Sequence, residues 1–345
     1  MSQPARTDEA EQQLEEPVEE QQLPWWQALV AGSSTWIGLI LVGLIVVFSL
    51  INPTDFFGAA NARNIATDAA VLLILATGMT YVIITSGIDL SVGSVLVFAG
   101  VIAAKLMNSI GGEGTGTILL GLAIALVAGA AWGFANGFLV AKAKIPPFIV
   151  TLGTFGMSLG AALLITGGVD EREVPIKLIT GIGTGRLFNQ IPWLVVIAAV
   201  VCLIFGVILG QTRFGRYTYA IGSNEEGVRR AGVGVDAHLI KVYMLMGTLS
   251  GLAGFLSLAR FGTTTVSGHT TDNLNVIAAV VIGGTSLFGG IGTILGTIFG
   301  VFIPAVLQNG FVIVGVQPFW QQVAVGAVLV GAVYLDQVRR ARYRQ

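Results

Sequence analysis

Asp89 and Ser91 stand in a polar break of an otherwise apolar stretch, residues 85–95, TSGIDLSVGSV. Their side-chain oxygens can accept hydrogen bonds from the free N–H groups of a helix that begins just after them. Gly87 and Gly93 let the backbone leave helical geometry. An ionised carboxylate near the middle of a bilayer costs about 2.5–3.5 kcal/mol, so an acid placed here is either functional or well paired. For Asp89 we favour a structural role, as a helix cap or an interhelical pair, over direct contact with a substrate.

A second interruption of the same kind is expected at residues 283–292. The segments 82–96, VIITSGIDLSVGSVL, and 281–295, VIGGTSLFGGIGTIL, align without gaps and share four identical positions. Transporters are often built from repeated halves with broken helices at matching places, although Gly-rich apolar sequence also produces such matches by chance. The glycines that the alignment marks in the second break are Gly283, Gly284, Gly289 and Gly290.

The composition is that of a protein that crosses a membrane several times. Of the 345 residues, 54% are hydrophobic and 11% are charged, whereas a soluble domain carries about 25% charged residues. The 47 glycines suit helices that pack closely through small residues. The single cysteine, Cys202, lies in an apolar run without a partner, which excludes a disulfide framework.

Apolar runs of about 20 residues predict an all-α fold of about ten transmembrane helices, with broken or re-entrant segments. The predicted spans lie at about residues 28–50, 69–84, 95–104, 117–140, 148–166, 191–209 and 242–261, with two more across 274–314 and a last one at 317–335. With this count, the basic loops at 142–144, 211–241 and 339–344 fall on one side. The acid-bearing loops at 108–116 and 167–190 fall on the other. By the positive-inside rule the basic side, which includes both termini, is cytoplasmic.

The chain divides into three predicted parts. Residues 1–26 form a disordered cytoplasmic tail, because the first 20 residues hold seven of the 19 acids and few apolar side chains. Residues 27–336 form the transmembrane domain, and residues 337–345 form a basic cytoplasmic tail. The acidic tail has the wrong charge for a nucleic-acid arm, and we assign it no function.

A short helix is predicted in the longest polar segment between spans, residues 211–241. It is formed by Asn224 as the N-cap, Glu225 and Glu226 in the first turn, Arg229 and Arg230 near the end, and Gly232 as the stop. Acids near the start and bases near the end match the helix dipole, and glycine suits a helix C-terminus. The residues alone leave two interpretations open: a helix that docks a partner, or a solvated helix that only joins two spans.

Residue patterns for catalysis are missing. The sequence has no G-x-x-x-x-G-K-[ST] phosphate loop and no nucleophile–base constellation, so we expect neither nucleotide hydrolysis nor another enzymatic activity. His238 and His269 lie far apart without cysteines or carboxylates at metal spacing, so we expect no metal ion and no bound cofactor. We expect His269 to be a loop histidine in water rather than part of an outer entrance.

Four motifs, in order, resemble the ABC sugar-importer permeases of the ribose, xylose and galactose type. They are GIDLSVGS (87–94), IPPFIVTLGTFG (145–156), RFGRYTYAIGSNEEGVRRAGV (213–233) and VIGGTSLFGGIGT (281–293). The resemblance runs from about residue 52 to residue 334 and is specific for the family, but not for the sugar. It implies the fold of a type II ABC importer permease in the bacterial inner membrane.

The resemblance also implies partners and a cargo, a monosaccharide or a related polyol. The partners are a second permease subunit in a homodimer or pseudo-dimer, a cytoplasmic ATPase with two nucleotide-binding modules, a periplasmic or lipid-anchored sugar-binding protein, and membrane lipid. ATP and Mg²⁺ would bind to the ATPase. Residues 224–232 would be the coupling helix, with Glu225, Glu226, Arg229 and Arg230 in contact with the ATPase. Gly227 stands where the family more often has Ala, which lowers helix propensity by ~1 kcal/mol.

A path for a neutral, polyhydroxylated sugar needs hydrogen-bonding groups with few fixed charges. The candidates are Asn136, Thr151, Thr154, Ser158 and Asn309, with Phe155 for packing against a pyranose face. Ordinary helix packing explains each of them as well.

Two other functions stay open at this point. An ion-coupled secondary transporter of a small polar solute would carry several intramembrane acids, and only Asp89 and Asp68 lie near a span. A non-transporting scaffold would not need two Gly-rich breaks.

Overall fold

The structure is a computed structural model that describes residues 33–266, 268–269 and 271–317, together with residues 320, 323, 326, 327 and 331. The predicted tails at residues 1–26 and 337–345 lie outside the described residues. So do the third basic loop, at residues 339–344, and most of the last predicted span.

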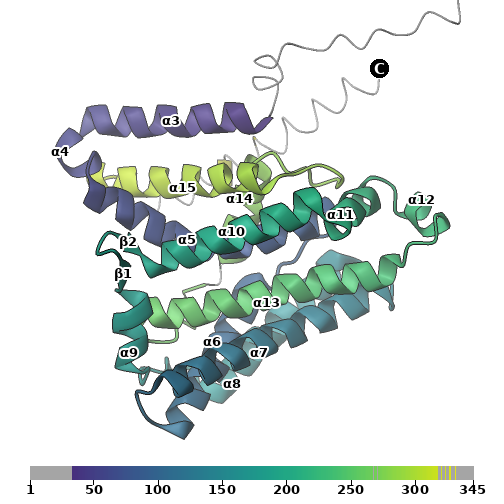
Figure 1. Cartoon of the computed structure of the whole chain (residues 1–345), viewed down its shortest axis with the longest axis horizontal. Helices are drawn as coiled ribbons and strands as arrows, with labels where there is room; N and C mark the ends of the chain where they lie inside the picture. Colours follow the sequence, from purple (N-terminus) through teal and green to yellow (C-terminus); the bar gives the residue numbers. More distant parts are fainter. Residues whose placement is uncertain are drawn as a thin grey trace, which may run out of the picture.

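Seven described helices are long and apolar enough to cross a membrane, and they run side by side in one bundle (Figure 1). They are α5 (Ala59–Ile84), α6 (Val92–Ile110), α7 (Thr115–Ala141), α8 (Pro147–Thr166), α10 (Trp193–Gln211), α13 (Val235–Phe261) and α15 (Ile294–Val314). A further apolar helix, α3 (Ser33–Ile51), lies along α15 at the edge of the bundle. The predicted all-α membrane fold is confirmed. Strands in the described part are limited to the antiparallel pair β1 (Arg186–Leu187) and β2 (Ile191–Pro192).

Short helices occupy segments for which no span was predicted. Before α5 comes α4 (Pro53–Phe56), which begins where the Asn52 side chain accepts a hydrogen bond from the Asp55 N–H at 3.2 Å. The loop at 167–190 contains α9 (Ile176–Leu178) and the π-helical turn η1 (Ile179–Gly183). The loop at 211–241 contains α11 (Arg213–Ser223) and α12 (Glu225–Arg230). No helix was predicted over α11, because its residues are not an apolar run.

Helices α7 and α13 pack backbone against backbone. A Cβ atom on Gly129 would lie 2.1 Å from the Gly247 carbonyl oxygen, and one on Gly133 would lie 2.3 Å from the Tyr243 carbonyl oxygen. No side chain fits at these distances, so glycine sets the spacing of the two helices, as small residues do in many membrane bundles.

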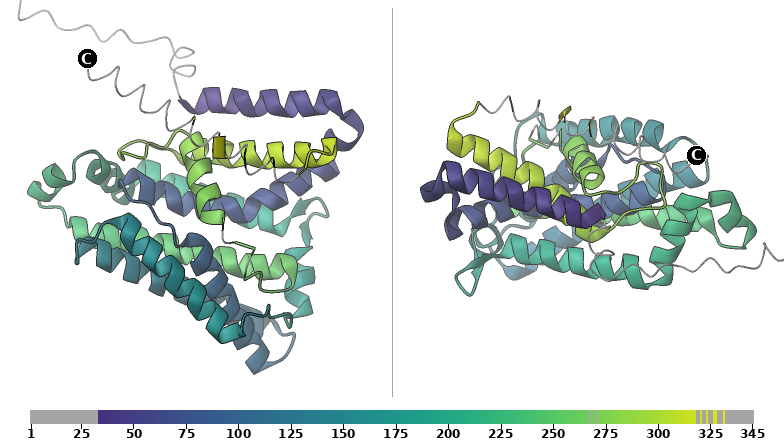
Figure 2. Two further views of the ribbon diagram at one scale, coloured as in Figure 1. Left: turned by 180° about the vertical axis from the view of Figure 1, so that it is seen from behind. Right: turned by 90° about the horizontal axis from the view of Figure 1, so that it is seen from above.

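The apolar region at 274–314 does not form the two full spans that were predicted. α14 (Asp272–Ile282) has 11 residues, or about 16 Å at 1.5 Å per residue, whereas a bilayer core measures about 30 Å. It packs against α5 and α15 as a short helix inside the bundle (Figure 2). The prediction is wrong for the first of the two spans, because the Gly-rich break follows after only three turns. The total of ten spans stays a prediction.

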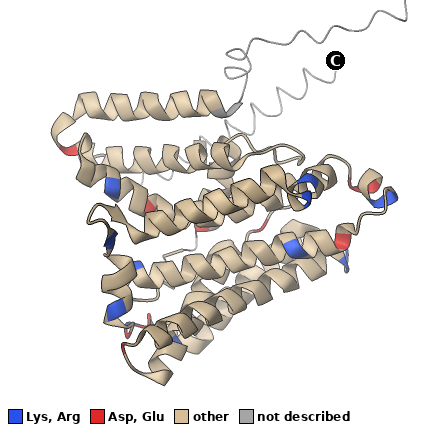
Figure 3. Cartoon of the chain, viewed as in Figure 1, with Lys and Arg blue, Asp and Glu red and all other residues tan. Residues whose placement is uncertain are grey.

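Charged residues gather near the two ends of the bundle (Figure 3). At one end, Asp236 accepts hydrogen bonds from Lys142 at 3.2 Å and Lys144 at 3.0 Å, which joins the first two basic loops. At the other end, Asn108 donates to Glu171 at 2.9 Å, which joins the two acid-bearing loops. The predicted grouping of these four loops is therefore confirmed, whereas the identity of the cytoplasmic side stays a prediction.

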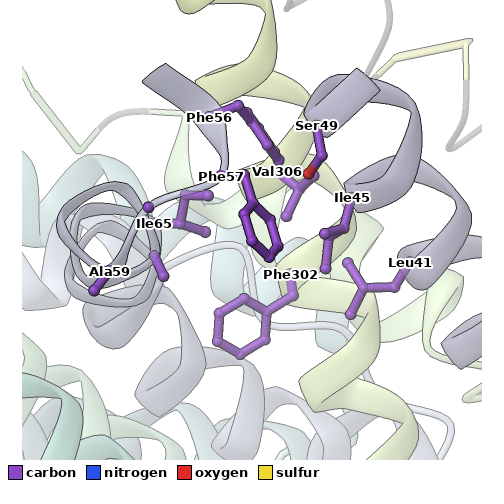
Figure 4. A pocket seen from close by; sticks show the side chains of 11 residues that line it. Leu41, Ile45, Ser49, Phe56, Phe57, Ala59, Ile65, Phe302 and Val306 are labelled. Carbon is purple, nitrogen blue, oxygen red and sulfur yellow. The ribbon is translucent and has the colours of Figure 1, made fainter. Parts of the chain in front are cut away.

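An apolar cavity of about 490 Å³ lies between α3, α4, α5 and α15 (Figure 4). Ile45, Phe57 and Phe302 are among the side chains that line it. The Ser49 hydroxyl, also in the lining, is buried without a hydrogen-bond partner in the described part of the chain. A site for a hydroxylated ligand needs convergent polar groups, and the lining of this cavity is almost entirely apolar.

Candidate translocation path and coupling helix

The first break, residues 85–91, joins α5 to α6. Asp89 is 2% exposed, and its Oδ1 accepts hydrogen bonds from the Ser91 N–H at 2.8 Å and the Ser91 hydroxyl at 2.6 Å. The carboxylate therefore closes the turn that precedes α6, and the choice of a structural role over substrate contact stays a prediction. Ser91 does not cap α6 through its side chain, because its backbone is in the helical region (φ −83°, ψ −6°) rather than the extended one of an N-cap, and its hydroxyl oxygen accepts from Asn136 instead. That part of the expectation is wrong.

Three candidate path residues contact this break or the helix that follows it. Asn136 of α7 donates a hydrogen bond to the Ser91 hydroxyl at 2.9 Å, and Thr151 of α8 donates to a carbonyl oxygen of the break at 3.1 Å. Ser158 of α8 donates to the Ser94 hydroxyl at 2.7 Å. All three are buried. In this conformation they hold the break against α7 and α8 and do not face an open passage.

The other three candidates differ in their surroundings. Thr154 is buried on α8, and Phe155 beside it is half-buried. Asn309 of α15 forms a reciprocal pair with Asn61 of α5, in which each amide donates to the other at 2.9 Å. Asn309 thus belongs to a different part of the bundle, and the structure does not bring it to the other candidates.

Sequence reasoning missed Tyr243 of α13. A Cβ atom on Gly87 would lie 2.5 Å from the Tyr243 hydroxyl oxygen, so glycine is needed at that position. The Tyr243 hydroxyl and Asn136 Oδ1 are both buried, and neither has a hydrogen-bond partner in the described residues. A buried polar group without a partner is costly, so these two atoms are available to a hydroxylated ligand or to water. No periodic signal marks Tyr243, which lies at the start of an apolar run.

We expect Asp89→Ala to lower the stability of the folded protein. The substitution leaves the buried Ser91 N–H without its acceptor, which costs about 1–3 kcal/mol, whereas Asp89→Asn keeps an acceptor oxygen and most of the stability. Thermal unfolding in detergent and sugar uptake would be measured on both variants. Uptake lost in Asp89→Asn at an unchanged unfolding temperature would instead assign the carboxylate to the sugar path.

The second break, residues 283–293, lies between α14 and α15, at the place that the internal alignment predicts. Gly284, Gly289 and Gly290 have φ angles of 85°, 84° and 74°, which residues other than glycine rarely adopt. A Cβ atom on Gly283 would lie 2.5 Å from the Gly296 carbonyl oxygen. Each of the four glycines singled out from the sequence therefore has a geometric reason.

The predicted coupling helix is α12. The Asn224 side chain caps it by accepting a hydrogen bond from the Gly227 N–H at 2.9 Å, and Gly232 follows its end with a φ angle of 82°. In Figure 1 the helix projects from one end of the bundle, beyond the ends of α10 and α13. The local structure is as the sequence predicted, and its role as a docking helix stays a prediction.

The charged residues of α12 form two different pairs. Arg229 donates to Asp236 at 2.8 Å and to Glu225 at 2.9 Å, and these bonds raise the pKa of its guanidinium above the ordinary value. Arg230 pairs with Glu226, and these two side chains are 79% and 72% exposed. Arg229 therefore fastens α12 to the first turn of α13, whereas Arg230 and Glu226 are presented to the surroundings.

His269 is 8% exposed, so the expectation of a histidine in water is wrong. Its Nε2 lies 2.9 Å from the Ser257 hydroxyl, and its Nδ1 lies 2.7 Å from an Asp272 carboxylate oxygen. The loop folds back on α6, where a Cβ atom on Gly93 would lie 2.3 Å from the His269 carbonyl oxygen. Within the described residues, no group of three or more His, Cys, Asp or Glu could hold a metal ion.

Comparison with known proteins gives a consistent result. Residues 61–333 match the family described as "Branched-chain amino acid transport system / permease component". The chain is 38% identical to the ribose import permease protein RbsC of Escherichia coli K12 over 305 residues, which cover 88% of this chain and 93% of that protein. It is 36% identical over 306 residues to the fructose import permease protein FrcC of Rhizobium meliloti, covering 87% and 84% of the two chains. It is 33% identical over 322 residues to the galactose/methyl galactoside import permease protein MglC of E. coli K12, covering 89% and 94%. No solved structure matches.

Proposed function

The chain belongs to the family described as the permease component of branched-chain amino acid transport systems, and on that premise we propose that it forms the membrane path of an ATP-driven sugar importer. It is a transport subunit rather than an enzyme, and ATP is hydrolysed on a separate chain. The observation that carries the sugar assignment is the likeness, over most of both chains, to three import permeases named for ribose, fructose and galactose. The proposed cargo is a monosaccharide or a related polyol.

The protein is a multi-pass protein of the inner membrane, and its orientation is part of the proposal. The end that carries α12, Lys142 and Lys144 faces the cytoplasm, because basic loops are retained on that side. There α12 docks on an ATPase with two nucleotide-binding modules, which holds ATP and Mg²⁺. A periplasmic or lipid-anchored binding protein delivers the sugar to the opposite end, and both termini lie with α12 on the cytoplasmic side.

A second permease subunit completes the proposed importer. Gly153, Gly156 and Gly160 follow one side of α8, and a Cβ atom added to any of them would meet nothing within 4 Å in the described part of the chain. A face of small residues allows close helix–helix approach in a membrane. We therefore place α8 toward a second copy of this chain, in a homodimer.

Ion-coupled secondary transport is disfavoured, because the two acids near a span that it would use, Asp89 and Asp68, both have partners in the structure. Asp89 Oδ1 is bonded to Ser91, and Asp68 pairs with Arg260 of α13. Both carboxylates therefore have structural partners, whereas a coupling ion needs carboxylates that can exchange a proton or bind a cation.

Purification in mild detergent from the native membrane tests the proposal. We expect a soluble ATPase with a phosphate loop to accompany the chain in stoichiometric amount. Proteoliposomes that contain this complex should take up radiolabelled ribose, fructose or galactose under two conditions only. ATP must be present on the side of the membrane that carries the ATPase, and the binding protein must be present on the opposite side. Uptake by the chain alone, driven by a proton or sodium gradient, would replace the importer by the secondary transporter.

A further inference from the structure

Three segments that are far apart in the sequence meet immediately before α12. They are the end of α5 with the first break, the last turn of α11, and the second break. We call this meeting point the break junction and define it by Ile84, Ser86, Tyr219, Gly222, Ser223, Phe288, Gly289, Gly290 and Gly292.

Hydrogen bonds tie the two breaks to each other. The Gly290 N–H donates to the Ile84 carbonyl oxygen at 2.9 Å. The Ser86 hydroxyl lies 2.9 Å from the Phe288 carbonyl oxygen and 3.4 Å from the Gly222 carbonyl oxygen, so it faces the second break and α11 together. Ser86 has a φ angle of 62°, which is unusual for a residue other than glycine.

Helix α11 is joined to the second break by Tyr219, whose hydroxyl donates to the Gly292 carbonyl oxygen at 2.6 Å. The Tyr219 side chain therefore links the last turns of α11 to the segment of the second break that leads into α15. Burial raises the pKa of the Tyr219 hydroxyl above its ordinary value, so it remains a donor at any physiological pH.

Contacts in the break junction are too close for side chains. A Cβ atom on Gly222 would lie 1.7 Å from the Ile84 carbonyl oxygen and 2.6 Å from the Gly290 nitrogen. One on Gly289 would lie 2.1 Å from the Ser86 hydroxyl oxygen. Packed interiors are bistable rather than continuously deformable, so a shift of the last turn of α11 toward either break would force that break to move.

We propose that the break junction transmits displacement of α12 to both broken segments, with Tyr219 and Ser86 as its positioning residues. α12 begins at Glu225, directly after the last turn of α11, so a pull on α12 reaches Gly222 and Ser223 first. From there the contacts lead to the turn that holds Asp89 and to the segment between α14 and α15. This inference rests on the proposed function, because it needs an ATPase that moves α12.

Tyr219→Phe is the first test, in proteoliposomes that contain the permease with its ATPase and binding protein. The substitution removes one hydrogen bond and keeps the ring, so we expect the amount of sugar moved per ATP hydrolysed to fall about three- to tenfold, the worth of one hydrogen bond. The probes are radiolabelled ribose, fructose and galactose, with phosphate release measured in the same vesicles.

Tyr81→Phe is the matched control. The Tyr81 hydroxyl also donates to a carbonyl oxygen, that of Phe205 at 2.5 Å, but inside the bundle and outside the break junction. We expect this variant to keep the wild-type ratio of sugar to ATP. Equal ratios in the two variants, whether both fall or neither does, would overturn the proposal. So would parallel losses of uptake and ATP hydrolysis in Tyr219→Phe.

Ser86→Gly distinguishes a loss of transmission from α12 to the breaks from a loss of stability of the folded protein. Glycine accepts the positive φ angle more easily than serine, so the unfolding temperature should not fall, yet the hydroxyl between the second break and α11 is lost. We expect a lower ratio of sugar to ATP, and an unchanged ratio would overturn the role of Ser86. If the complex moves no sugar even with the wild-type chain, the proposed function fails instead, which keeps the two failures distinct.

Discussion

Arg229→Glu together with Arg230→Glu is expected to reduce sugar uptake below about a tenth of the wild-type rate while the bundle stays folded. The double variant places four acids on α12 and removes both of its cations. Like charges brought together at an interface cost several kcal/mol, and about 1.4 kcal/mol already corresponds to a factor of ten. Three measurements check this expectation. Uptake in proteoliposomes reports transport, co-purification reports ATPase binding, and the elution profile of the permease in detergent reports whether the bundle is folded. Normal uptake would remove α12 from the coupling role.

Separate variants at the two arginines distinguish their roles. Arg229 is bonded to Asp236 and Glu225, so Arg229→Gln should loosen the attachment of α12 to α13. The exchange Glu226→Arg with Arg230→Glu keeps an ion pair within the helix and the net charge, but reverses the charges that α12 presents. We expect this exchange to weaken ATPase binding, because electrostatic complementarity selects partners. Full ATPase binding by the exchanged helix would show that the contact lies elsewhere.

Gly129→Leu is expected to prevent accumulation of folded protein. The added side chain would have to enter a contact in which even a Cβ atom lies 2.1 Å from the Gly247 carbonyl oxygen. Inserting extra methylenes into a well-packed core costs about 1–3 kcal/mol, and more where backbones must separate. Size-exclusion profiles of a fluorescent fusion in detergent report the folded fraction, and thermal unfolding reports what remains.

Gly43→Leu is the control for this substitution. Gly43 lies in the middle of α3, and an added Cβ atom there meets nothing within 4 Å in the described part of the chain. Both changes place the same apolar side chain in an apolar helix, so they differ only in what the side chain meets. A folded fraction equal in the two variants would contradict the close packing of α7 and α13.

The helices that could be predicted from the sequence are those with a long apolar run or a clear cap. Within the described residues, seven apolar runs form helices long enough to cross a membrane, and α12 was found from Asn224 and the charges after it. The length of α14 was overestimated as a full span, because hydropathy does not distinguish a residue buried in lipid from one buried in protein. α11 was missed because its residues are mixed in character and its place is set by contacts such as that of Gly222 with Ile84, which leave no periodic pattern.

Residue type predicted the candidate path only in part. Asn136 and Thr151 contact the first break and Ser158 contacts Ser94 of α6, but Asn309, chosen on the same grounds, pairs with Asn61 elsewhere. An amide or hydroxyl that can bond a sugar can equally bond a neighbouring helix, and the sequence does not say which way it points. The contact between the two breaks was not predicted either, although the alignment had marked both.

The pairing of α3 with α15 has a consequence for the order in which the protein is assembled. Phe48 of α3 packs against Phe56 and Phe311, with ring centroids 5.4 and 6.1 Å apart, in a small cluster separate from the main core. At roughly 5–20 residues per second, the ribosome needs on the order of 10–50 s after α3 to reach α15. During that interval the described elements beside α3 are α4 and α5, and its remaining apolar side chains can face lipid. The first described helix to enter the membrane is therefore among the last to acquire its permanent neighbour.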